Sequence, residues 1–123
     1  MSTHKRVVEQ YFDGFRHGDH AAILALLTDD VVWDLPGHAR REGKVEFDQE
    51  IENEAFTGRL TLRLDRLVEE GDAVVAIGTG AASMKSGETH RFAYCDVFTF
   101  SGERISRVES YLVPLAGEAS AQV

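Results

Sequence analysis

The chain has 123 residues, enough for one domain but too few for two that each bury an adequate core. Hydrophobic residues make up 43% and charged residues 28% of the sequence, and no apolar run is long enough to span a membrane, so we expect one folded domain over residues 1–123 and no membrane partner. The 21 acidic side chains outnumber the 13 basic ones, and the formal net charge of −8 argues against nucleic acid as a partner.

Signals for oxidation or secretion are absent from the sequence. Cys95 is the single cysteine, so no intramolecular disulfide can form. Residues 1–6 lead into an amphipathic pattern and lack the apolar core of a signal peptide. We therefore expect a cytoplasmic location.

Helical periodicity occurs in three segments. In the first, five apolar residues share one face: Val7, Val8, Tyr11, Phe12 and Phe15. Gly18 favours the end of this helix, and Asp19 can cap a second one that runs to Leu27. A third helix is predicted between Gly43 and Gly58, with Gly58 as its left-handed end. Its apolar side consists of three residues spaced four apart: Phe47, Ile51 and Ala55.

Strand signals begin before the third helix and dominate after it. Residues 31–33 predict a short strand that stops at residues 36–37, and the basic cluster that follows, Arg40, Arg41 and Lys44, is expected to be a solvated loop. Alternating apolar residues with short turns between them predict four strands, near residues 60–69, 73–83, 89–100 and 104–113. The ordered core should cover about residues 4–115, and residues 118–123 should fray.

This order of elements predicts the α+β class, with three helices on one face of a curved antiparallel sheet. A cavity between the two layers follows naturally from such an arrangement. Its roof would consist of apolar helix residues and the first residues after them: Tyr11, Phe15, Phe47, Ile51 and Phe56.

The segment 92–100 carries the clearest chemical signal. Its period of two places one carboxyl, Asp96, among four aromatic residues on the same face: Phe92, Tyr94, Phe98 and Phe100. If this face is buried, Asp96 must be hydrogen-bonded, paired or neutral with a raised pKa. A neutral acid and the Tyr11 hydroxyl from the facing helix can both donate to a developing oxyanion. Alternatively, Asp96 caps a backbone amide or meets a buried arginine, and Tyr11 is a core residue.

Several motifs together resemble the nuclear transport factor 2-like superfamily, and within it the SnoaL-like and ketosteroid isomerase-like group. They are found at residues 9–19, 26–33, 36–37, 94–98 and 102–105, so the resemblance covers residues 5 to about 113. It implies a cone-shaped fold with a cavity and a homodimer. Because this fold hosts many functions, the activity depends on individual residues.

Compared with the ketosteroid isomerases, the resemblance places Tyr11 at their oxyanion-binding tyrosine and Asp96 at their protonated aspartic acid. The position of their proton-abstracting aspartate falls on Leu35, whereas Asp34 lies one residue away and would face the other side unless a bulge restores it. The resemblance to polyketide cyclases makes Asp96 an acid/base, without a secure match for their histidine. The Arg-x-Asp motif of limonene epoxide hydrolases has no counterpart on the second long strand, and Ser110 takes the place of their other aspartate.

The sequence therefore predicts a small-molecule enzyme that performs cofactor-free acid/base chemistry, isomerisation or cyclisation, on a hydrophobic carbonyl compound. The candidate catalytic residues are Asp96, Tyr11 and Asp34. The candidate substrate-binding residues are Phe15, Trp33, Leu35, Phe47, Ile51, Phe56, Tyr94, Phe98, Val108, Ser110 and Leu112. Trp33 has two interpretations, either a cavity wall or a residue packed beneath a helix.

No metal site is expected, because His17 and His20 lie on either side of a helix break, and His90 is expected at the rim of the cavity. The outer sheet face, with Tyr111 between charged neighbours, is the expected homodimer surface. Two rivals remain. In the first alternative to the enzyme, the protein is a non-catalytic member of the superfamily that binds a ligand or another chain. In the second, it is a regulatory dimer that acts through its outer sheet face.

Overall fold

The computed structural model describes the backbone of residues 2–51 and 56–115, and the side chains of residues 2–51 and 60–115. Within these residues the elements are α1 (Thr3–His17), α2 (His20–Leu24), β1 (Leu27–Leu35), β2 (Ala39–Glu42), α3 (Gly43–Ile51), β3 (Phe56–Glu70), β4 (Ala73–Met84), β5 (Thr89–Ser101) and β6 (Arg104–Pro114). The predicted fraying of residues 118–123 lies outside the described residues.

Helix α1 ends where its sequence predicts. The Ser2 hydroxyl accepts a hydrogen bond from the Lys5 amide at 3.0 Å and so caps the first turn. Gly18 adopts a left-handed φ of 63°, which a residue without a side chain reaches at little cost, and its amide bonds the last helical carbonyls. The helix buries the apolar stripe that defines it, including Val8, Tyr11 and Phe12.

Contacts at both ends fix α1 to the sheet. Near its start, the His4 ring stacks on Phe100 with centroids 4.1 Å apart, and His4 Nε2 lies 2.9 Å from the Gly102 carbonyl oxygen. Near its end, Arg16 Nε donates to the Leu62 carbonyl oxygen at 3.0 Å. The helix is therefore attached both to the β5–β6 turn and to β3.

The second helix is shorter than predicted. The Asp19 side chain caps α2 by accepting a hydrogen bond from the Ala22 amide at 3.1 Å, as expected. The helix ends at Leu24, however, and Leu27 begins β1. Leu27 is fully buried and pairs with Ile105 of β6, so long-range strand pairing replaces the last helical turn.

The six strands of the described residues form one sheet in the order β2-β1-β6-β5-β4-β3. Strands β3 to β6 form the predicted antiparallel meander. Strand β1 pairs with β6 in parallel, which corrects the expectation of a purely antiparallel sheet. The chain can join these two strands in parallel because α3 and the meander lie between them in the sequence.

The basic segment is a strand and not a solvated loop. Gly37, with a φ of 80°, turns the chain so that β2 pairs antiparallel with β1. Arg40 and Arg41 lie in this strand, and Arg41 Nε donates to Glu50 Oε1 of α3 at 2.9 Å. Lys44 belongs to α3. The loop prediction was wrong because strand pairing with β1 and ion pairs stabilise this segment, which has little hydrophobic pattern of its own.

The third helix also differs from its prediction. It ends at Ile51 within the described residues, and β3 begins at Phe56. Gly58 therefore lies inside a strand and does not end a helix, while Ala55 lies outside the described residues. Pairing of Phe56 with Met84 of β4 draws this segment into the sheet.

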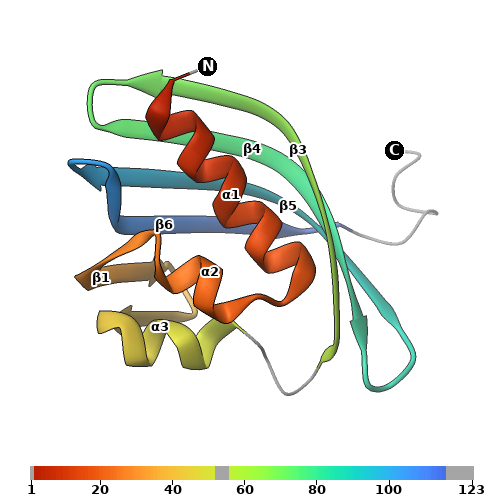
Figure 1. Ribbon diagram of the computed structural model, residues 1–123. Helices are drawn as coiled ribbons and strands as arrows, with labels where there is room; N and C mark the ends of the chain where they lie inside the picture. The colour runs from red at the N-terminus through yellow and green to blue at the C-terminus, as the bar shows by residue number, and fades with distance from the viewer. Residues whose placement is uncertain (1, 52–55, 116–123) are drawn as a thin grey trace.

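Figure 1 shows α1, α2 and α3 on one side of a strongly bent sheet. Buried apolar residues from the helices and the facing side of the strands form one core between the two layers. The other side of the sheet, called the open face below, carries Val68, Val75, Ile77, Cys95, Val97, Tyr111 and Val113, and no helix of the described residues covers it.

Two glycines of β4 allow aromatic side chains of β5 to lie across that strand. A Cβ atom on Gly78 would collide with the Arg63 carbonyl oxygen and lie 2.6 Å from the Tyr94 hydroxyl oxygen. A Cβ atom on Gly80 would lie 2.5 Å from the ring of Phe92. Residues 78–83 thus belong to a strand whose glycines make room for neighbouring rings.

Candidate active site

Asp96 lies in the middle of the sheet on the face that the helices cover. Its register partners are Ala76 on β4 and Ser110 on β6, and only 8% of its surface is exposed. Phe98 and Phe100, at the next even positions of β5, are buried on the same face. The alternation of the strand therefore places a carboxyl group in an apolar layer.

The environment of Asp96 favours its neutral form. Burial raises the pKa of this carboxyl from 3.8 to about 7, although a hydrogen bond from Ser110 acts in the opposite direction. Asp96 Oδ1 is buried and has no hydrogen-bond partner among the described residues. A buried acceptor without a partner is rare and is available to a donor or to a proton. Neither of the structural alternatives, an amide cap or a buried arginine, is seen at this oxygen.

Tyr11 reaches the same apolar layer from α1. Its ring packs against Phe98 with centroids 5.0 Å apart, and against Phe15 at 4.8 Å. Burial, together with the negative charge of Asp96, raises the pKa of Tyr11 well above its ordinary value. The hydroxyl consequently stays protonated at neutral pH and remains a hydrogen-bond donor.

Trp33 and Ser110 form a second polar pair in this layer. The indole Nε1 of Trp33 donates to Ser110 Oγ at 2.9 Å, and both side chains are buried. The Trp33 ring stacks on Phe47 of α3 with centroids 4.4 Å apart. Of its two interpretations, packing beneath a helix is therefore the observed one.

The chain has these features in common with a known family. The SnoaL-like domain family matches residues 8–108. The chain belongs to this family. No curated protein matches the sequence, whereas many solved structures share the fold.

Three solved structures illustrate the likeness of this SnoaL-like domain. An NTF2-like protein of unknown function from Burkholderia pseudomallei is 22% identical with a TM-score of 0.85, and the match covers 92% of either chain. A candidate polyketide cyclase from Xanthomonas campestris is 25% identical with a TM-score of 0.80, over 89% of this chain and 92% of that one. A candidate ketosteroid isomerase from Kribbella flavida is 18% identical with a TM-score of 0.75, over 93% and 80%. At these identities the likeness establishes the fold.

The structure does not bring Asp34 together with Asp96 and Tyr11. Asp34 pairs in register with Glu109 of β6, on the open side of the sheet, and its Oδ2 accepts a hydrogen bond from Arg107 at 3.0 Å. No bulge at Asp34 restores it to the covered face, since residues 32–34 pair in continuous register with β6. Asp34 therefore lies apart from Asp96 and Tyr11 and forms an ion pair with Arg107.

Most of the predicted binding residues belong to the hydrophobic core or pack against it. Leu35, Phe98 and Val108 are buried, and Phe15 and Ile51 are partly buried against the same core.

Two of these residues differ from expectation, and one cannot be placed. The Tyr94 hydroxyl donates to the Arg63 carbonyl oxygen at 2.9 Å, so it is already occupied, and its pKa is raised to about 12 by burial and by Asp96. Leu112 is 53% exposed and therefore lies outside the buried core. The side chain of Phe56 lies outside the described residues.

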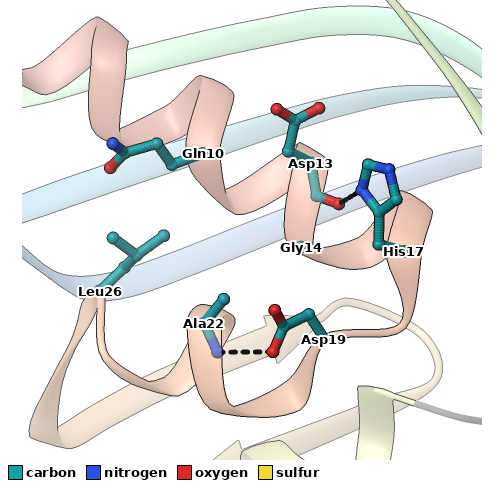
Figure 2. A pocket seen from close by; sticks show the side chains of 7 residues that line it. All are labelled: Gln10, Asp13, Gly14, His17, Asp19, Ala22 and Leu26. Carbon is teal, nitrogen blue, oxygen red and sulfur yellow. Dashed lines mark hydrogen bonds between the residues drawn. The ribbon is translucent and has the colours of Figure 1, made fainter.

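An open pocket of about 360 Å³ lies elsewhere, between α1 and α2 (Figure 2). Its lining residues are Gln10, Asp13, Gly14, His17, Asp19, Ala22 and Leu26, none of which was predicted as a site residue. Two of its polar side chains already stabilise the helices, because Asp19 caps α2 and His17 Nδ1 lies 2.8 Å from the Asp13 carbonyl oxygen. This pocket does not contain the chemistry found around Asp96.

The remaining candidates lie at the surface. His90 is exposed and stacks on Phe92 with centroids 6.1 Å apart, and Cys95 lies on the open face. Residues 2–51 and 60–115 contain no group of three side chains that could hold a metal ion. No helix of the described part of the chain is long and apolar enough to cross a membrane.

The contact between Trp33 and Ser110 was missed by the sequence, although both residues were candidates. Their strands are distant in the chain, and only the parallel pairing of β1 with β6 brings them together. A polar residue at an otherwise apolar position of β6 was the one available signal.

Proposed function

We propose that this SnoaL-like domain is an enzyme that moves protons on a hydrophobic carbonyl compound without a cofactor, as in an isomerisation or a cyclisation. Asp96 is the proposed acid and base, and Tyr11 is the proposed donor to the oxyanion. The observation that carries the proposal is the buried Asp96 carboxyl, with one oxygen unpartnered among the described residues and a pKa of about 7.

A carboxyl group with this pKa is present in both protonation states at neutral pH. The same group can therefore accept a proton from the carbon beside a carbonyl and return it at another position. Negative charge develops on the carbonyl oxygen in between, and the neutral Tyr11 hydroxyl can stabilise it by donating a hydrogen bond. This division of roles needs no second carboxylate, which is consistent with the place of Asp34 on the open face.

The proposed substrate would bind beside Asp96, between the helices and the sheet, where the family resemblance implies a cone-shaped cavity. The aromatic rings of Phe15, Trp33 and Phe47 lie next to one another on the covered side, with Phe15 5.9 Å and Phe47 4.4 Å from Trp33. Such rings favour a flat, apolar compound, and a small number of polar groups would orient its carbonyl.

Proton exchange tests this function without knowledge of the natural substrate. Polycyclic and terpenoid ketones are first screened for those that raise the melting temperature of the protein, because a ligand of the native state stabilises it. The ketones that bind are then incubated with the protein in D₂O, and deuterium incorporation beside the carbonyl is followed by NMR. We expect protein-dependent exchange that Asp96→Asn abolishes and that Tyr11→Phe slows on the order of 100-fold.

A matched control is Asp72→Asn, which makes the same change at an exposed turn residue and should leave exchange intact. Exchange at the wild-type rate in folded Asp96→Asn protein would contradict the proposal.

The alternative is a non-catalytic member that binds a small molecule. It is favoured by the position of Asp34, which lies on the open face away from Asp96, since the isomerases use two acidic groups. In the same experiment this alternative predicts ketones that raise the melting temperature but show no deuterium incorporation.

We further propose that two copies of the chain associate through the open face, in the cytoplasm. Four large apolar residues are exposed there: Val68, Ile77, Tyr111 and Val113. Exposed apolar side chains on one face of a sheet favour association, and a second copy offers a matching surface.

A further inference from the structure

The Trp33–Ser110 pair has a fixed direction. An indole N–H can only donate, so Ser110 Oγ is the acceptor in the 2.9 Å contact. A serine hydroxyl has one proton and two acceptor sites, and Trp33 occupies one of the acceptor sites. The proton of Ser110 is consequently left for a different partner.

Asp96 is the acceptor that lies directly opposite Ser110 on the neighbouring strand. A hydrogen bond from Ser110 lowers the pKa of Asp96 and thus acts against burial, which dominates. The register of Ser110 opposite Asp96, together with the unpartnered Oδ1, points to Oδ2 as the acceptor of the Ser110 proton. The two oxygens of the carboxyl group are therefore not equivalent.

The other ionisable groups that face Asp96 do not set its charge. Tyr11 from α1 and Tyr94 on β5 both respond to the charge of Asp96, and both have pKa values raised far above neutral pH. Its facing residue on β4 is Ala76, which does not titrate. Among the described residues, Ser110 is therefore the polar group that lowers the pKa of this carboxyl.

We propose that Trp33 is a positioning residue which, through Ser110, directs a hydrogen bond to Asp96 Oδ2 and leaves Oδ1 as the oxygen that exchanges its proton. The catalytic consequence rests on the function proposed above. The hydrogen-bond relay itself is a property of the free protein and can be tested without a substrate.

The chain offers a direct probe, because Trp33 is its single tryptophan and gives one indole N–H signal in a ¹H–¹⁵N NMR spectrum. We expect this signal to shift between pH 5 and 9 with the midpoint of the Asp96 carboxyl, followed by its ¹³C resonance. Ser110→Ala and Asp96→Asn should each remove the pH-dependent shift of the indole signal. An indole signal that stays constant while Asp96 titrates overturns the inference.

Substitution of the donor gives an independent second test. Trp33→Phe should raise the Asp96 midpoint by about half to one pH unit, which corresponds to one weakened hydrogen bond. Phe47→Leu is the matched control, because it disturbs the ring stacked on Trp33 and keeps the indole N–H. Equal changes in the two variants would contradict a role for the N–H group.

These outcomes are separable from those of the exchange experiment. If the indole signal follows Asp96 but no ketone exchanges deuterium, the relay is supported and the proposed reaction fails. If exchange depends on Asp96 but the indole signal does not respond to it, the reaction stands and Trp33 has no positioning role.

Discussion

Asp96 is a carboxyl group whose surroundings oppose its charge, and this has a consequence for stability. Its pKa is about 7 in the folded protein and close to 3.8 in an unfolded chain, so the folded state binds more protons between these values. The free energy of unfolding must therefore decrease as the pH rises through this window. Below this pH window the carboxyl is protonated in both the folded and the unfolded state. Above the window, burial of the charged carboxylate lowers the free energy of unfolding by about 4 kcal/mol.

Asp96→Asn isolates this effect, because the amide does not titrate. We expect the variant to gain about 2 to 3 kcal/mol of stability relative to the wild type when the pH is raised from 5 to 8. Urea unfolding at several pH values measures both free energies. If the free energy of unfolding had the same pH dependence in both proteins, Asp96 would not be buried in its charged form.

At the scale of elements, the close packing of β4 against β3 and the rings of β5 depends on the glycines of β4. In Gly78→Ala the new Cβ atom would meet the Arg63 carbonyl oxygen and the Tyr94 hydroxyl, and neither backbone nor ring can withdraw easily. We expect a loss of about 3 kcal/mol or more in the free energy of unfolding, at the upper end of overpacking.

Thr79→Ala is the control for this substitution. It changes the next residue of the same strand, which is partly buried on the opposite face, and should cost much less. A Gly78→Ala protein as stable as this control would mean that β3 and β4 can separate without penalty.

The elements also show which features the sequence could predict. The alternation in β5 and the stripe on α1 are local patterns, so they predicted correctly that Asp96 and Tyr11 are both buried. The parallel pairing of β1 with β6 depends on residues far apart in the chain, and no local pattern contains it. For the same reason the relay from Trp33 to Ser110 could not be predicted, although Asp96 could.

Segments at element ends were the other failures. The spacing of Phe47 and Ile51 continued to Ala55 and suggested a longer helix, but pairing with β4 begins already at Phe56. Similarly, β2 has a weak hydrophobic pattern and exists because a turn at Gly37 places it beside β1. Local propensity is weaker than tertiary pairing at such positions.

At the scale of the whole molecule, the two faces of the sheet have separate roles in our proposal. Ile77 lies on the open face of β4, where its register partners are Cys95 and Arg66. We expect Ile77→Glu to convert a dimer into a monomer, because two copies would then bury like charges against each other. Sedimentation velocity at several protein concentrations measures this directly.

Val45 provides the matched control for the dimer. It is 74% exposed on α3, which lies on the covered side of the sheet, so Val45→Glu should leave the assembly unchanged. A wild-type protein that is monomeric at all concentrations would contradict association through the open face.

The attachments of α1 determine how rigid the site can be. His4 holds one end of the helix at the turn after β5, and Arg16 holds the other at Leu62 of the edge strand β3. The helix thus connects two distant parts of the curved sheet. If the sheet flattened, either the His4 or the Arg16 contact would have to break. Tyr11 lies between these two attachments, so the position of its hydroxyl depends on them as well as on the rings packed against it.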